Sequence, residues 1–176
     1  MTHVRTVPLP YVDTHTTVVP AGADVVWRTI GEVMGRSFAG RGGAAYTRLV
    51  GAADRALPGA HPLAVGSTVR GFRVTAADSE RELALTGRHR FSAYTLTFRL
   101  TPEGPGHTRV SAETRAVFPG PAGRLYRLLV IGTGAHAAVM RRMLTTISNR
   151  APKGREALRD KPQITRTRHT TMRPEL

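Results

Sequence analysis

The stretch "RLLVIGTGAHAAVMRRML", residues 127–144, decides between two folds for this chain of 176 residues. Leu128 to Ile131 could form a buried strand, and Gly-Thr-Gly-Ala-His-Ala (132–137) then has the G-x-G-x-x-A spacing of a dinucleotide-binding turn. That fingerprint requires a parallel strand ending in an acidic residue about 20 residues downstream. The downstream segment here, KGREALRDKP (153–162), is polar and has no apolar strand. The pattern therefore disfavours a nucleotide-binding domain.

A single helix over residues 121–149 accounts for more of the sequence around this stretch. At about 100° per residue, with Leu125 at the centre of a face, the apolar residues and one histidine fall within about 60° of it; they are Leu128, Leu129, Gly132, His136, Val139, Met140, Met143 and Ile147. Pro152 and Gly154 would end this helix. Each interior glycine costs about 1 kcal/mol relative to alanine, so Gly132 and Gly134 predict a bend or an empty space at mid-helix.

The chain before this helix predicts an antiparallel sheet and one amphipathic helix. The helix runs from Asp24 to Met34, after Pro20. Alternation is clear in the later strands, where Tyr94, Leu96, Phe98 and Leu100 share one dry face. The six candidate strands are 11–19, 45–50, 67–76, 81–91, 93–101 and 107–118, with a long loop at 51–66.

Composition excludes several kinds of chemistry. The chain has no cysteine, so it has no disulfide, no thiolate nucleophile and no cysteine-ligated metal. Its histidines show no local metal-binding spacing, and no G-x-S-x-G motif is present. The N-terminus lacks the apolar core of a signal peptide, and the apolar stretch 128–140 is too short to span a bilayer. These features predict a cytoplasmic protein that uses neither a metal nor a nucleotide cofactor.

The net charge of +14 raises the question of a polyanionic partner. The charge is almost entirely arginine, and residues 150–176 carry eight basic against three acidic residues. Two interpretations stay open for this segment: a solvated tail, or a tail that contacts nucleic acid. The predicted organisation is a leader (1–10), one domain (11–149) and a basic tail (150–176).

The order of elements resembles the helix-grip fold of the START-like (SRPBCC) superfamily. Three segments resemble the sequences of small actinobacterial members of its polyketide cyclase/dehydrase-like group: "TVVPAGADVVWRTIGEVM" (17–34), "GRHRFSAYTLTFRL" (87–100) and "FPGPAGRLYRLLV" (118–130). The resemblance implies an α+β fold: a curved antiparallel sheet of six to seven strands wrapped around a long C-terminal helix. It covers about residues 11–149, and the family usually has seven strands where the pattern shows six. A strand within 52–66, or a lid there, would account for the difference.

The resemblance also implies an elongated apolar cavity between the long helix and the sheet, in which a hydrophobic small molecule binds. His136, His89 and Tyr94 are the candidate catalytic residues, because imidazole titrates near neutral pH and a phenol can orient a carbonyl. Each has a simpler interpretation as a packed side chain with its polar atoms satisfied. The candidate ligand contacts are Arg70, Phe72, Leu85, Phe91, Phe98, Tyr126, Leu129, Gly132, Val139, Met140 and Met143.

Three functions follow as hypotheses. The protein, as a monomer or homodimer, would enclose a polyketide- or lipid-like ligand and catalyse its cyclisation or dehydration. Alternatively, the same cavity would serve a carrier or sensor without chemistry. The third hypothesis is a polyanion-binding module that uses the basic tail.

Overall fold

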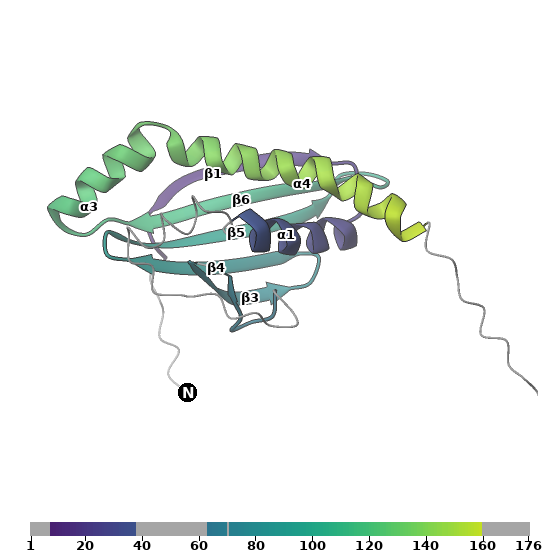
Figure 1. The fold of residues 1–176 in the computed structure, drawn as a ribbon, viewed down its shortest axis with the longest axis horizontal. Helices are drawn as coiled ribbons and strands as arrows, with labels where there is room; N and C mark the ends of the chain where they lie inside the picture. Colours follow the sequence, from purple (N-terminus) through teal and green to yellow (C-terminus); the bar gives the residue numbers. More distant parts are fainter. Residues whose placement is uncertain (1–7, 38–62, 70, 160–176) are drawn as a thin grey trace, which may run out of the picture.

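A computed structural model describes residues 8–37, 63–69 and 71–159 of the chain. These residues form a six-stranded antiparallel sheet that is covered on one face by helices. The strand expected at 45–50, most of the loop 51–66, and Arg70 lie outside these residues. The sheet order is β1-β6-β5-β4-β3-β2 (Figure 1). The strands are β1 (Tyr11–Val19), β2 (Thr68–Val69), β3 (Phe72–Asp78), β4 (Glu82–His89), β5 (Ser92–Pro102) and β6 (Thr108–Val117).

Helix α1 (Ala23–Ser37) follows β1, and the chain after β6 forms α3 (Gly120–Arg127), a π-helical segment η1 (Leu128–Gly132) and α4 (Ala135–Arg159). Helix α4 packs on α1 and on β1 (Figure 1). Because the sheet is antiparallel and open and a long C-terminal helix lies on it, the predicted α+β helix-grip class is confirmed. No helix in the described part of the chain is both long and apolar enough to cross a membrane.

Period-2 alternation predicted the two faces of the sheet correctly. Leu96, Phe98 and Leu100 are buried on β5, and Leu83 and Leu85 are fully buried on β4. The strand expected at 67–76 is instead two short strands, because the chain turns at Gly71, whose φ of 85° suits glycine. On the opposite face, Glu113 pairs with Arg99 and Arg115.

The prediction of one unbroken helix over residues 121–149 is wrong. The chain leaves helical geometry at Gly134, whose φ is 75°, a left-handed conformation that costs glycine little. The N–H of Gly134 donates to the Ile131 carbonyl at 3.0 Å, and the Thr133 hydroxyl donates to the Leu129 carbonyl at 2.6 Å. The Ala135 N–H in turn donates to Thr133 Oγ1 at 3.4 Å. The "GTG" sequence thus ends one helix and starts the next.

The break separates the predicted apolar stripe into two halves with different outcomes. After it, Met140, Met143 and Ile147 are buried against the sheet and α1, as expected. Before it, Leu125, Leu128 and Leu129 are 70%, 68% and 65% exposed, so their expected burial is wrong. The angular positions calculated for one continuous helix do not hold on both sides of Gly134, because a left-handed residue changes the direction of the helix axis. Val139, although it follows the break, is also exposed.

The C-terminal end of α4 also differs from expectation. Pro152 does not stop the helix, which continues to Arg159, and Ala151 beside it is fully buried. Proline inside a helix removes one backbone hydrogen bond, at a cost of about 3 kcal/mol or more. Burial of the preceding turns against α1 and β1 offsets part of that cost.

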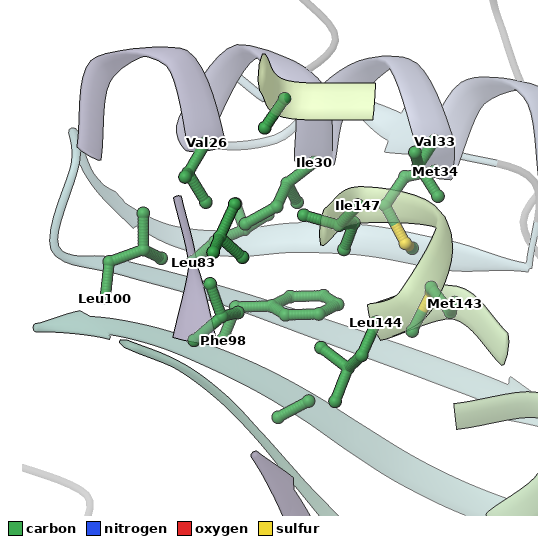
Figure 2. Packing of buried hydrophobic residues seen from close by; sticks show 14 of the residues in the cluster. Val26, Ile30, Val33, Met34, Leu83, Phe98, Leu100, Met143, Leu144 and Ile147 are labelled. Atoms are coloured by element: carbon green, nitrogen blue, oxygen red, sulfur yellow. The ribbon is translucent and has the colours of Figure 1, made fainter. Parts of the chain in front are cut away.

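The core lies where α1 and α4 meet the sheet. Figure 2 shows Phe98 of β5 pointing into a cluster with Ile30 of α1 and Ile147 of α4. All three side chains are fully buried, and each contributes about 1.5–3 kcal/mol relative to exposure. This part of the helix–sheet interface is filled by side chains.

We predict that Gly134→Ala destabilises the protein by about 1–2 kcal/mol, because alanine adopts a positive φ only with strain. Gly132→Ala is the matched control: an added Cβ there would meet only Leu128 Cδ2, at 3.9 Å. The control should be neutral or slightly stabilising, since alanine favours helix. Urea unfolding of the two variants measures the difference, and equal stabilities would contradict the assigned role of Gly134.

Candidate functional site

A polar cluster lies on the otherwise apolar face of the sheet, under the first turn of α4. Alternation along β1 puts Asp13 and His15 on the same face as the fully buried Val19. Cross-strand pairing then places Thr114 of β6 opposite Asp13. His136 comes from α4, on the second residue after the helix restarts. We call Asp13, His15, Thr114 and His136 the acid–imidazole cluster.

The Asp13 carboxylate stands between two imidazoles. His15 Nε2 lies 3.1 Å from Asp13 Oδ2, and His136 Nε2 lies 3.4 Å from Asp13 Oδ1. His136 Nε2 is also 3.1 Å from the Thr114 hydroxyl oxygen. The contacts of His136 within the described residues therefore all involve Nε2. A tautomer with the proton on Nε2 leaves the Nδ1 lone pair as its basic position.

This cluster carries an unsatisfied acceptor. Asp13 Oδ1 is buried and has no hydrogen-bond partner within the described residues. Burying a charged oxygen without a donor costs free energy, so such a group calls for a reason other than stability. The side chains of Asp13, His15 and His136 keep 25%, 17% and 21% of their surface exposed. The cluster is therefore partly exposed to solvent.

A second group of side chains, on or next to strands β3 to β6 and on helix α3, consists of aromatic rings. Tyr126 of α3 stacks on Phe91, with ring centroids 5.4 Å apart, and meets His89 edge-on at 5.0 Å. Tyr94 lies 5.5 Å from His89 and 5.2 Å from Phe72. Such offset and edge-to-face pairs are each worth about 0.5–1.5 kcal/mol beyond their buried area. We call Phe72, His89, Phe91, Tyr94, Phe118 and Tyr126 the aromatic cluster.

Strand register relates the backbone positions of the two clusters on this face of the sheet. Thr114 and Ala116 are successive positions of β6 on this face, and Ala116 pairs with Tyr94 of β5. Tyr94 in turn pairs with Gly87 of β4. The aromatic cluster therefore begins one position along the strands from Thr114.

Gly87 makes the position of Tyr94 possible. A Cβ at Gly87 would lie 2.3 Å from both a ring carbon of Tyr94 and the Gly71 carbonyl oxygen. The bare glycine backbone lets the ring cross β4, where the Tyr94 hydroxyl donates to the Gly71 carbonyl at 2.8 Å. The phenol proposed to orient a ligand carbonyl is thus already donating within the protein.

His89 is held by two hydrogen bonds. Its Nδ1 accepts from the Phe91 backbone N–H at 3.2 Å, so Nε2 carries the proton and donates to Ser92 Oγ at 3.1 Å. Burial lowers the pKa of His89, because desolvation penalises the charged imidazolium. Both nitrogens are occupied in the neutral form, so this side chain lacks the free nitrogen that the expected proton shuttle would need.

The remaining sequence candidates fall into three groups. Phe72, Phe91 and Tyr126 join the aromatic cluster. The core takes Leu85, Phe98, Met140 and Met143, whereas Leu129, Gly132 and Val139 are exposed. Arg70 lies outside the described residues.

Asp13 and His15 escaped the sequence analysis, although a usable signal existed. Counting back by twos from Val19 places both on the dry face of the first strand. Two polar, titratable residues in phase with a buried valine would have indicated a site. Their proximity to His136 could not be predicted, because it depends on where the helix restarts after Gly134.

A separate groove borders α1, away from the residues of the two clusters. It has a volume of about 620 Å³ and runs between α1 and the end of β3, where Trp27, Leu63, Val65 and Ala77 line it. This groove does not include any residue of the acid–imidazole or aromatic cluster.

Comparison with known proteins supports the fold. No protein-family model and no curated protein matches the chain. Among solved structures, DynU16 from the dynemicin biosynthetic locus has a TM-score of 0.50 at 14% identity, over 80% of this chain and 47% of its own. The Zhui aromatase/cyclase from Streptomyces sp. R1128 has a TM-score of 0.49 at 14% identity, covering 80% and 93%. A protein from Thermobifida fusca has a TM-score of 0.49 at 19% identity, covering 80% and 92%.

At these identities the similarity concerns the fold alone. The chain therefore shares its overall fold with DynU16. The α+β helix-grip fold expected from the sequence is thereby confirmed. What the protein binds has to be argued from its own site.

We predict that His89 makes the protein less stable in mild acid. Because burial lowers its pKa below the ordinary value of 6.5, the unfolded chain binds a proton more readily than the folded one. Stability is therefore full above about pH 6.5 and falls as pH decreases toward the lowered pKa.

Urea unfolding at about pH 7.5 and 5.5 measures this loss. His89→Gln should reduce the loss, whereas His107→Gln, at an exposed histidine in the β5–β6 turn, should leave it unchanged. An unchanged pH dependence in His89→Gln would overturn the assignment.

Proposed function

We propose that the protein binds a hydrophobic small molecule, of polyketide or lipid type, against the acid–imidazole and aromatic clusters. The observation that carries this proposal is the partly exposed Asp13–His136 pair beside a wall of aromatic rings on one face of the sheet. Ligand sites are mostly apolar, with a few polar groups that fix orientation. The aromatic cluster supplies the apolar surface, and the acid–imidazole cluster supplies the polar groups.

The ligand contacts in this proposal differ from those expected along the whole helix. Phe98 and Met143 belong to the filled core, so the site is limited to the end of the sheet near the Gly134 break. Phe72, Phe91 and Tyr126 form its apolar wall. A flat, fused-ring or folded-chain ligand suits stacking on such rings.

We further propose that His136 acts as a general acid–base catalyst of cyclisation or dehydration. His136 Nδ1 would accept a proton from a carbon between two carbonyl groups, and the resulting enolate would attack a second carbonyl carbon of the same chain. The imidazolium then returns its proton to the new alkoxide, and loss of water gives the ring double bond. Atoms and charge balance without an external reactant.

Asp13 and Thr114 would position the catalyst. A carboxylate beside Nε2 fixes the tautomer and stabilises the imidazolium when it forms. His15, on the other carboxylate oxygen, holds Asp13 in place. Holding a flexible chain against the aromatic wall also brings its reacting carbons together.

A cytoplasmic carrier or sensor would use the same contacts without turnover. The distinction is testable, because only the catalyst depends on proton transfer by His136. Neither version requires the basic segment 150–176, of which residues 160–176 lie outside the described residues.

The catalytic proposal predicts a selective effect of His136→Gln. Glutamine keeps a hydrogen-bonding side chain of similar reach but cannot transfer a proton, so turnover should fall at least about tenfold with little loss of binding. Linear poly-β-ketone thioester analogues serve as substrates, and loss of water is followed by mass spectrometry. Asp13→Asn should show the same pattern, and His107→Gln is the control.

Two outcomes would overturn the catalytic proposal. Wild-type protein that binds the analogues and returns them unchanged would identify a carrier. Full turnover in His136→Gln would reduce His136 to a packed side chain.

A further inference from the structure

The outer surface of α3 and η1 carries large apolar side chains in a regular pattern. Leu125, Leu128 and Leu129 occur at positions i, i+3 and i+4, which share one helix face, and each is at least 65% exposed. Scattered exposed leucines are common, but three on adjacent turns form a patch. We call these three residues the leucine face.

The leucine face is held outward by the opposite side of α3. Gly123 is buried there, and an added Cβ would lie 2.7 Å from the Phe118 carbonyl carbon and 3.0 Å from the Phe91 carbonyl oxygen. Tyr126 on this side packs on Phe91 and His89. Because α3 is fixed by these contacts, rotation of the leucines toward the sheet would break the aromatic cluster.

The charged residues of α3, which carries part of the leucine face, are all positive. Arg124 and Arg127 are exposed on the same helix, and no aspartate or glutamate occurs between Glu113 and Glu156. That acid-free stretch spans all of α3 and η1 and most of α4. An apolar helix face bordered by arginines complements a surface that is apolar inside and negatively charged outside.

We propose that the leucine face binds the surface of a membrane rich in anionic phospholipids. The leucines would enter the boundary between headgroups and acyl chains, while Arg124 and Arg127 contact lipid phosphates. A second copy of the chain fits less well, because pairing two leucine faces would bring four of these arginines together without a compensating acid. The binding is peripheral, and it does not depend on the proposed catalytic activity.

Vesicle flotation tests this proposal with the full chain. Vesicles of phosphatidylcholine with about 30% phosphatidylglycerol should carry the protein, and pure phosphatidylcholine vesicles should carry much less. The triple variant Leu125→Gln, Leu128→Gln, Leu129→Gln should lower partitioning onto the anionic vesicles about tenfold or more. Val65→Gln, which changes another exposed apolar residue, should bind as the wild type does.

A charge-matched pair of variants separates local from general electrostatics. Arg124→Gln with Arg127→Gln should weaken vesicle binding more than Arg28→Gln with Arg109→Gln, which removes the same charge elsewhere. Arg28 and Arg109 form exposed ion pairs with Asp24 and Glu103, whose loss has little effect on stability. Circular dichroism and thermal melting check that every variant is folded.

Insertion of the leucine face into vesicles can be measured with a fluorophore on one introduced cysteine, because the chain has no cysteine of its own. A bimane fluorophore attached at Leu128→Cys should shift to shorter wavelength on anionic vesicles, and one at Val65→Cys should not.

Three results would overturn the proposal: no binding of the wild type to anionic vesicles, equal binding by the folded triple-leucine variant, or a wild-type dimer that this variant dissociates without any vesicle binding. The second would assign the binding to charge alone, and the third would assign the leucine face to a second copy.

Discussion

The left-handed backbone at Gly134 is the constraint on which the rest of the site depends. It ends the first helical segment after β6 and starts α4 in a new phase, so that His136 in the first turn of α4 reaches Thr114 and Asp13. Without this break, a straight helix would keep one face toward the sheet from Leu125 to Ile147. With it, the two segments have independent orientations, and only α4 contributes to the core.

As a result, helices α3 and α4 have different roles in the structure. Helix α4 stabilises the protein by burying Met140, Met143 and Ile147 against α1 and the sheet. Helix α3 contributes one half-buried aromatic ring, Tyr126, to the candidate site, and Leu125 of α3 remains exposed together with Leu128 and Leu129 of η1. A π-helical segment joins α3 to the break, and such irregular turns are frequent at functional sites.

Much of the sheet was predictable because period-2 alternation responds directly to burial on one face. The dry faces of β4, β5 and β6 follow from residues such as Leu83, Phe98 and Val110. The last helix was harder to predict, because a single helical phase does not continue through the left-handed residue Gly134. The sequence did point to Gly132 and Gly134 as the place of a bend, but which glycine takes a positive φ is a property of the folded chain.

The candidate site could be predicted only in part. His136 is a candidate because it lies in an apolar stripe, Phe91 because it is in phase with dry strand positions, and Tyr126 because it flanks the stripe of the last helix. Asp13 needed the alternation of β1 to be followed from Val19, and its distance of 3.4 Å from His136 depends on the break. One buried carboxylate oxygen, Asp13 Oδ1, accepts no hydrogen bond within the described residues, and such an atom lowers stability, which is typical of residues retained for function.

The central claim is that a hydrophobic ligand binds where the acid–imidazole and aromatic clusters meet, and nuclear magnetic resonance tests it most directly. Neutral 1,8-dihydroxyanthraquinone is titrated into protein labelled at the histidine and tryptophan rings, with the His136 signal assigned from His136→Gln. Shifts of the His136 and His15 signals, with the single tryptophan (Trp27) unchanged, would support the account. Shifts confined to Trp27 would place the ligand in the groove between α1 and β3, and would contradict it.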